Sequence, residues 1–529
     1  MKQRIFTATQ IAFGITFATI LLLLTAFTHA AYARKQLFLL PNVAIVAFMA
    51  ALWVVGTALY LHYPKKRPCL CLSSCWRMKL VLPITTIALF LGQCFMMHSI
   101  FFETGWDAYN VLTAARTVAY YGENWSQTYF SIYPNNLLIT YIYAVILRIN
   151  DLVGLFPREI DAMSIVVVNC LLNAISCALV YKTARLFTPV KVALFAYVAA
   201  VLAFGISAWS VIGYSDSFAL FIPILSAYLY AVPTKSARKK LALQLGAIAL
   251  STFGYFIKPT CGIMAIALLL LQATRVFDHF SIKKLLRPLA FLLAVLCVIF
   301  GTKLLLNVAN SKAKLAINEE QALGITHFLM MGQNTDTDGV FSGEDVEFSR
   351  SFESKRERTV ANLSRSINRI REMGLGGWAK HLAKKLLVTF NDGTFAWGKE
   401  GNFYRNFPAQ TTGEGSAFLR ALYYDTHTNN RYLALGQQAT WLTILAFSFM
   451  SVFVYNTFSH KHTLCVLWMT ALGFVAYELL FEVRARYIYV FVPLFCVLAA
   501  IGFFNSLRMM KIATARMAKK KQTDKKPSV

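Results

Sequence analysis

One carboxylate in this chain has neighbours that suit it to take a proton. Asp107 lies in the segment Gly105-Trp106-Asp107-Ala108-Tyr109, where aromatic side chains stand close on both sides. A carboxylate in an apolar setting suits general-base chemistry near neutral pH when the donor hydroxyl lies within hydrogen-bond reach. A solvated loop aspartate is the simpler interpretation of Asp107 taken alone, so residues elsewhere in the chain must decide between the two.

Three cations have the side-chain types that bind phosphate. Lys258 interrupts a long uncharged run beside Pro259, so it either forms a hairpin tip or projects into a polar space between helices. Arg484 and Arg486 stand two residues apart, next to Tyr487. Arginine anchors helices at membrane interfaces, and its planar fork also donates two hydrogen bonds to one phosphate.

These residues depend on a membrane domain to bring them together. Hydrophobic residues make up 57% of the chain, and the mean hydropathy is +0.53. A helix needs roughly 20 apolar residues to cross the hydrocarbon core. Such runs fall near residues 5–30, 38–61, 80–100, 161–181, 190–209, 212–231, 242–257, 259–274, 288–307, 437–457, 463–481 and 487–506. Unpaired backbone amides are costly in lipid, and no alternating barrel pattern occurs, so we expect an all-α polytopic protein with about twelve spans.

The basic loops predict the orientation. With twelve spans, the loops rich in Lys and Arg all face the cytoplasm, as do both termini, and the first helix is retained because it is longer than a signal peptide's apolar stretch. Residues 134–148 would reach only about 22 Å against a core of about 30 Å. We therefore expect them to lie on the outer surface. The basic cytoplasmic loops, which are attracted to anionic lipids, then account for the net charge of +27. This charge gives no reason to expect a nucleic-acid partner.

This topology divides the chain into five parts. Residues 1–79 form two helices and a basic inner loop, and residues 80–307 form a membrane core that contains the first outer loop, 101–160. A large outer loop, 308–436, has helical periodicity from Glu353 to Phe390, broken at Gly374 and at Gly376-Gly377. The last membrane helices follow at 437–507. We expect the Lys-rich tail, 508–529, to be unstructured and to bind anionic headgroups.

The cysteines do not indicate a disulfide framework or a standard metal site. The predicted outer loops contain none except Cys261, which lies just inside a membrane helix. Cys69, Cys71 and Cys75 lie in an inner basic loop, with a spacing that matches no standard zinc pattern. We interpret them as plain thiols, with palmitoylation the other reading.

The order of these motifs resembles that of the C-type (GT-C) glycosyltransferase superfamily, which includes protein O-mannosyltransferases and the aminoarabinose transferase of lipid A. The shared pattern consists of a carboxylate in the first large outer loop, a short surface helix, a cationic tip and an Arg-Tyr pair before the last apolar run. Three segments are also similar to very hydrophobic membrane proteins of Gram-positive bacteria assigned to that superfamily. They are Tyr129-Phe130-Ser131-Ile132-Tyr133-Pro134-Asn135-Asn136, Ile257-Lys258-Pro259-Thr260, and Asn391-Asp392-Gly393-Thr394-Phe395 with Trp397-Gly398. The resemblance spans about residues 80–506.

The resemblance implies transfer of a sugar from a polyprenyl-phosphate donor, with inversion, on the outer face of a bacterial plasma membrane. The acceptor would be an envelope polymer, a glycolipid or a protein. Asp107 would be the general base, and Lys258, Arg484 and Arg486 would bind the donor phosphate. The candidates for sugar or acceptor contacts are Trp106, Tyr133, Asn135, Asn136, Asp216, Trp397 and Tyr487. Several of these residues also have a simpler structural interpretation. Pro134 next to Tyr133 and Asn135 marks a helix start, Asp216 suits a helix N-terminus, and Trp397 can pack against helices.

The chain also departs from the superfamily pattern. Two helices precede the proposed catalytic loop, and Trp106 occupies the position where relatives carry a second acidic residue. Glu103 is the only other nearby acid, so we expect no metal bridging two carboxylates and no cofactor. A transporter or flippase for an envelope precursor is the competing class, although no inverted repeat is evident. An inactive relative that only binds the lipid-linked sugar is a third.

Overall fold

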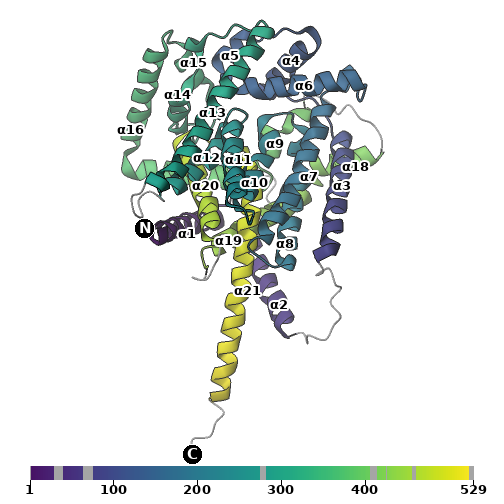
Figure 1. Ribbon diagram of the computed structural model, residues 1–529, viewed down its shortest axis with the longest axis vertical. Helices are drawn as coiled ribbons and strands as arrows, with labels where there is room; N and C mark the ends of the chain where they lie inside the picture. Colours follow the sequence, from purple (N-terminus) through teal and green to yellow (C-terminus); the bar gives the residue numbers. More distant parts are fainter. Residues whose placement is uncertain are drawn as a thin grey trace, which may run out of the picture.

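Long helices dominate the protein. The computed structural model describes residues 2–28, 40–62, 75–274, 282–405, 414–424, 426–454 and 460–523, and these contain helices and no strand. Cys69 and Cys71 lie outside the described residues. The bundle is built from α1 (Lys2–Ala26), α2 (Asn42–His62), α3 (Cys75–Ser99), α7 (Met163–Arg185), α8 (Val190–Ala200), α10 (Phe221–Ala231), α11 (Ala237–Tyr255), α12 (Gly262–Ala273), α13 (Ile282–Lys312), α19 (Asn430–Met450), α20 (Lys461–Leu480) and α21 (Val492–Thr523) (Figure 1).

Within the described ranges, nine helices are long and apolar enough to cross a membrane. Eight of them coincide with predicted spans, and the ninth is Pro134–Val153, which we predicted to lie on the surface. Three further predicted runs form shorter apolar helices, at Val190–Gly205, Ser215–Ala231 and Pro259–Ala273. The polytopic, all-helical class is therefore confirmed, whereas the count of twelve spans stays a prediction.

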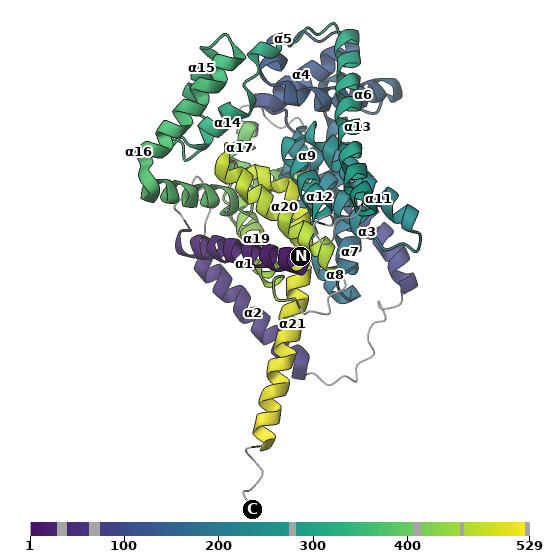
Figure 2. The ribbon, with the colours of Figure 1, turned by 60° about the vertical axis from the view of Figure 1, so that its left-hand side comes forward.

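Two helices lie across one end of the bundle. They are α4 (Trp106–Tyr121) and α6 (Leu137–Val153), joined by α5 (Gln127–Ile132) and packed against each other. In Figures 1 and 2 both run across the page, whereas α7 and α21 follow the long axis. This direction is the one expected of a surface helix, although the length and composition of Pro134–Val153 also permit a span.

The large loop is folded around a bent helix. It contains α14 (Gly324–Gly332), α15 (Gly343–Arg350), α16 (Lys355–Phe390) and α17 (Trp397–Glu400), followed by α18 (Glu414–Tyr423). α16 bends at Gly374, whose φ of 61° lies in the left-handed region, so the break predicted there is confirmed. The break predicted at Gly376-Gly377 is wrong, because the helix continues through both residues. A two-contact ion pair from Arg369 to the buried Asp345 ties α16 to α15, with Nη2 2.7 Å from Oδ1 and Nη1 3.0 Å from Oδ2.

The segment Asn391-Asp392-Gly393-Thr394-Phe395 is a turn that fastens this loop to the bundle. The Asp392 carboxylate accepts hydrogen bonds from the backbone N–H of Thr394, at 2.7 Å, and of Ala396, at 3.1 Å. The Asn391 Oδ1 accepts from the Asn42 amide at 2.6 Å. A Cβ on Gly393 would lie 2.5 Å from the carbonyl oxygen of Gln437, so only glycine fits there. This motif therefore has a structural role.

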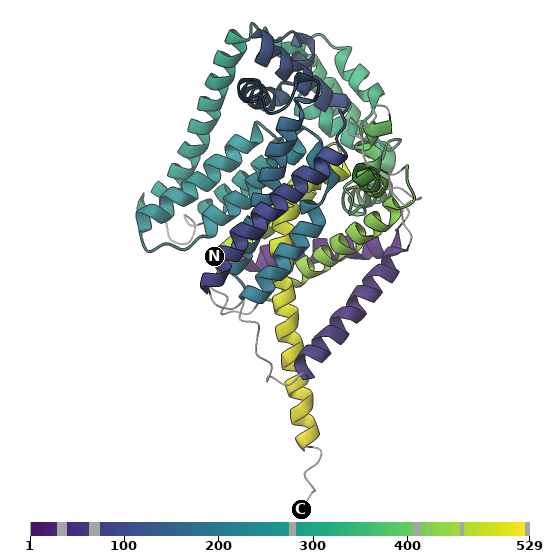
Figure 3. The ribbon, with the colours of Figure 1, turned by 90° about the vertical axis from the view of Figure 1, so that its right-hand side faces the viewer.

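The last helix is the centre of the bundle and extends beyond it. α21 packs against α19, α8 and α7, and its residues Val492 and Leu494–Ile501 are buried. Its far end projects past every other element (Figure 3). The prediction of an unstructured tail is wrong as far as Thr523, because α21 continues to that residue. Alanine, methionine, lysine and arginine are strong helix formers and extend a helix that is already nucleated.

Candidate functional site

The Asp107 carboxylate is held by two tyrosine hydroxyls. Tyr129 donates to Oδ1 at 2.9 Å and Tyr214 donates to Oδ2 at 3.4 Å. Asn136 connects both tyrosines, since its amide nitrogen donates to the Tyr129 hydroxyl at 2.6 Å and its oxygen accepts from Tyr214 at 3.3 Å. Asp107 therefore has a fixed orientation in the first turn of α4.

The phenols beside Asp107 stay protonated, so they remain donors. Burial raises the pKa of Tyr129 well above its ordinary value, and the nearby Tyr214 and Asp107 raise it further. Burial and the charge of Asp107 also raise the pKa of Tyr133 to about 12. The Tyr133 ring lies 5.4 Å from that of Tyr129 and supports it.

The backbone before Asp107 is strained. Trp106 has a φ of 40°, which a bulky residue rarely adopts. Its indole Nε1 donates to the carbonyl oxygen of Glu400 at 3.2 Å, which holds the ring in place. A Cβ on Gly105 would overlap the Phe403 ring. The close packing of α17 and its following residues against this turn therefore requires glycine at 105 and fixes the indole.

The three predicted cations lie together in one cluster, in which Lys258 and Arg486 are buried and Arg484 is partly buried. Lys258 Nζ is 2.6 Å from Asp216 Oδ1, and the Arg486 Nε is 3.7 Å from Asp216 Oδ2. The side chains of Lys258 and Arg486 are only 9% and 8% exposed, which fits a polar interior and excludes a solvated hairpin tip for Lys258. Lys258 Nζ also lies over the Tyr487 ring, 4.3 Å from its centroid.

Two acids that the sequence did not single out complete this cluster. Glu400 Oε2 is 3.3 Å from the Arg486 Nε, and its Oε1 is 3.5 Å from the Arg484 Nη1. Glu482 Oε1 is 3.0 Å from the Arg484 Nε. The three cations Lys258, Arg484 and Arg486 are therefore matched by the three carboxylates of Asp216, Glu400 and Glu482. The only sequence signal for Glu400 was its place three residues after Trp397.

Aromatic rings connect the Asp107 group to the cation cluster. The Arg486 guanidinium lies over the Trp106 ring, 4.4 Å from its centroid, and 5.8 Å from that of Tyr214. Trp106 and Tyr214 meet edge to face, with ring centroids 5.6 Å apart. The base candidate and the phosphate-binding candidates thus form one continuous site. It is built from α4, α5, the turn that precedes α6, the start of α9 (Ser215–Ala219), the turn between α11 and α12, α17, and residues 482–487.

A buried lysine holds the C-terminal end of α20 beside this site. Lys385 Nζ donates to the carbonyl oxygens of Gly332, Leu479 and Phe481, at 2.8, 3.0 and 2.7 Å. Burial lowers its pKa to about 7, against the opposing charges of Glu478 and Glu482. Because Phe481 directly precedes Glu482, Lys385 positions the segment that carries Arg484 and Arg486.

Other predicted residues lie apart from this centre. Trp397 is 4% exposed and packs edge to face against Trp209, with centroids 5.5 Å apart, so its position favours the packing role. Asn135 is exposed, and its amide donates to Asn136 Oδ1 at 3.1 Å. Glu103 pairs with Arg116 at 2.6 Å, and Arg116 also binds Asp161. No group of three or more metal-ligand side chains occurs among the described residues.

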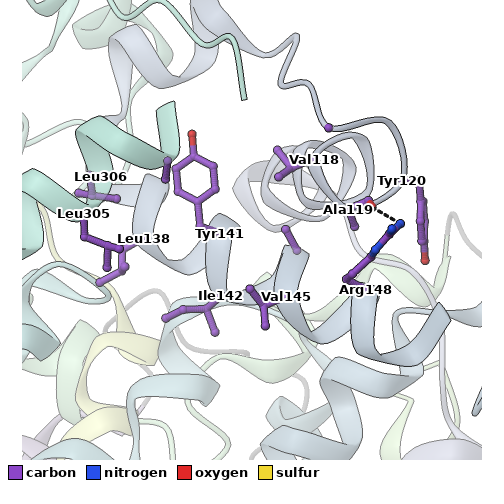
Figure 4. A pocket seen from close by; sticks show the side chains of 13 residues that line it. Val118, Ala119, Tyr120, Leu138, Tyr141, Ile142, Val145, Arg148, Leu305 and Leu306 are labelled. Carbon is purple, nitrogen blue, oxygen red and sulfur yellow. Dashed lines mark hydrogen bonds between the residues drawn. The ribbon is translucent and has the colours of Figure 1, made fainter. Parts of the chain in front are cut away.

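A cavity of about 630 Å³ lies between α4, α6 and α13. Its walls are mainly aliphatic, from residues such as Leu138, Val145 and Leu305 (Figure 4). Arg148 lies at one edge, and its guanidinium donates to the carbonyl oxygen of Ala119 at 3.2 Å. The cavity thus offers apolar volume with one cation, next to the helix that follows Asn136.

The comparisons with known proteins show a family for this chain. A family model described as "conserved hypothetical integral membrane protein" matches residues 3–507. No curated protein and no solved structure matches this chain.

Proposed function

This chain belongs to the family of conserved hypothetical integral membrane proteins, and from that premise we propose that it is a glycosyltransferase. In this proposal it moves a sugar from a polyprenyl-phosphate donor to a hydroxyl group of an envelope polymer, glycolipid or protein. The reaction takes place at the outer face of a bacterial plasma membrane. The GT-C fold, the twelve spans and cytoplasmic termini are part of the same proposal.

One observation carries the proposal: the rings of Trp106 and Tyr214 lie between an oriented carboxylate, Asp107, and Arg486, which belongs to the cluster of three cations. Inverting transfer needs these two groups. A base takes the proton of the attacking hydroxyl, and cations stabilise the charge on the departing phosphate. Their meeting point at the end of the bundle suits a donor that arrives from the bilayer.

Each group of site residues has its own role in the proposed reaction. Asp107 accepts the acceptor proton as the new oxygen–carbon bond forms at the anomeric carbon. The bond from that carbon to the phosphate oxygen breaks, and the electron pair leaves with the lipid phosphate. Lys258, Arg484 and Arg486 bind that phosphate, while Trp106, Tyr133, Asn136 and Tyr487 contact sugar or acceptor. Asn135, Asp216 and Trp397 stay weaker candidates for such contacts. The charges are supplied by side chains alone, so no metal is proposed.

The test is sugar transfer by purified protein in lipid, with labelled polyprenyl-phosphate sugars as donors and envelope extract as acceptor. We expect Asp107→Asn, which is nearly isosteric, to slow transfer by roughly 10²–10⁴-fold, the usual contribution of a general base. Donor binding should survive. Asp161→Asn is a remote control, because Asp161 binds Arg116 and Tyr120. Equal loss in both variants would assign Asp107 a structural role.

A transporter or flippase remains the second candidate, favoured by the buried ion pairs at Lys258 and Arg486. Ionisable residues inside membrane proteins commonly line transport pathways. Wild-type protein that turns over no donor in the panel, yet moves a lipid-linked sugar across vesicles, would replace the enzyme proposal with this one.

A further inference from the structure

The three cations proposed to hold the donor phosphate are already neutralised by carboxylates. Each of Lys258, Arg484 and Arg486 has an acidic partner within 4 Å, among Asp216, Glu400 and Glu482. A phosphate that enters this cluster must compete with one of them, because a buried site cannot hold unbalanced charge cheaply. The contacts identify which carboxylate gives way.

Asp216 is held most firmly. Its Oδ1 lies 2.6 Å from Lys258 Nζ, its Oδ2 faces Arg486, and its side chain is 3% exposed in the first turn of α9. Glu482 lies 3.0 Å from the Arg484 Nε and also accepts a hydrogen bond from the Tyr487 hydroxyl at 3.4 Å. Both carboxylates are part of the permanent frame.

Glu400 is held more loosely. Its two oxygens lie 3.3 and 3.5 Å from the arginine nitrogens, whereas the shortest contacts of Asp216 and Glu482 with the cations are 2.6 and 3.0 Å. It bridges Arg484 and Arg486 with one negative group, which is the arrangement that the departing lipid phosphate, a phosphate monoester, would adopt on two guanidinium groups. A phosphate offers more acceptor oxygens than a carboxylate and so satisfies the two arginines better.

The backbone that carries Glu400 is strained. Phe395 and Ala396 precede the four-residue helix α17 with φ of 55° and 59°, and neither is glycine. Such residues cost free energy that a shift of the segment can release. The Glu400 carbonyl oxygen also accepts the hydrogen bond from the Trp106 indole, next to Asp107. A shift of this backbone segment would therefore move the acceptor of the Trp106 indole, next to Asp107.

We propose that Glu400 is a placeholder for the donor phosphate: it neutralises Arg484 and Arg486 when the site is empty, and the phosphate displaces it. This inference rests on the proposed function and goes beyond it, because it assigns a regulatory role to a carboxylate in the phosphate site. It predicts that an uncharged side chain at position 400 strengthens phosphate binding, although it removes a contact from both arginines.

The experiment measures binding of a polyprenyl monophosphate to protein in nanodiscs, with the matching polyprenol and inorganic phosphate as separate arms. We expect Glu400→Gln to bind the monophosphate about tenfold more tightly than wild type, as expected when a competing charge is removed. Binding of the polyprenol should not change. Glu400→Asp, which keeps the charge, should restore the wild-type affinity.

Glu103→Gln is the matched control, because Glu103 also pairs with an arginine that keeps a second carboxylate, Asp161. It should bind the monophosphate within twofold of wild type. A similar increase in both variants would show a general charge effect and overturn the placeholder role. Monophosphate binding that is equal or weaker in Glu400→Gln would also overturn it while leaving the donor assignment standing. If neither wild type nor Glu400→Gln binds the monophosphate in preference to the polyprenol, both proposals fail. Thermal unfolding of each variant checks that the fold is retained.

Discussion

Buried ionisable side chains organise the end of the bundle that carries the candidate site. Lys385 differs from the site cations because its partners are three backbone carbonyl oxygens rather than a carboxylate. Carbonyl oxygens orient an ammonium group but carry no full negative charge to offset its burial. The amine therefore loses its proton more readily than an exposed lysine.

We expect this lysine to give stability a specific pH dependence. Its pKa is lowered from 10.5 to about 7 in the folded state, mainly by burial. Between these values the unfolded chain binds more protons than the folded one, so stability increases as the pH rises from about 7 towards 10.5. The slope is at most about 1.4 kcal/mol per pH unit. Thermal unfolding of wild type and Lys385→Met across this range measures it.

The control is Lys384→Met, since Lys384 is partly exposed and pairs with Asp338 at 2.7 Å. It should keep the wild-type slope, whereas Lys385→Met should lose it. An identical pH profile for wild type and Lys385→Met would show that Lys385 keeps its proton in the folded protein.

At the scale of elements, close helix contacts depend on glycine. Gly502 on α21 packs directly against the backbone of Phe447 on α19, and a Cβ at this position would overlap the Phe447 carbonyl oxygen. Membrane helices gain van der Waals contact where small residues let their backbones approach, because lipid supplies no hydrophobic force between them. This contact sets the distance between the two central helices.

We expect Gly502→Val to separate α19 from α21 and to destabilise the protein by about 1–3 kcal/mol, the usual cost of overpacking. Gly301→Val is the matched control, because Gly301 lies inside α13 with nothing within 4 Å of its Cβ position. Comparison of their unfolding midpoints in the same detergent separates packing from helix propensity. Equal midpoints for the two variants would refute the close contact.

The sequence predicted elements better than the contacts between them. Hydropathy located the long helices, and the glycine at 374 located the bend in α16, because these signals are local. Glu400 was missed because its importance comes from Arg484 and Arg486, which lie far away in the chain. The motif at 391–395 was predicted as part of a family pattern, and only the contact of Asn391 with Asn42 reveals its fastening role.

At the scale of the whole molecule, the direction of α6 determines which face each later loop meets. We expect cysteines at the exposed positions Trp125 and Arg158, on either side of α6, to react with an impermeant reagent from the same, outer side. A cysteine at Lys239, in a predicted inner loop, should react only after permeabilisation. Opposite sidedness at 125 and 158 would make Pro134–Val153 a span and invert every loop that follows.

The protruding end of α21 has a geometric consequence. The helix has 32 residues, so at 1.5 Å per residue it is about 48 Å long, against a hydrocarbon core of about 30 Å. The C-terminal part of α21, which contains Lys511 and Arg516, extends beyond the bundle as a single helix. A large molecule that approaches this end of the bundle therefore contacts α21 first and stays at a distance from the other helices.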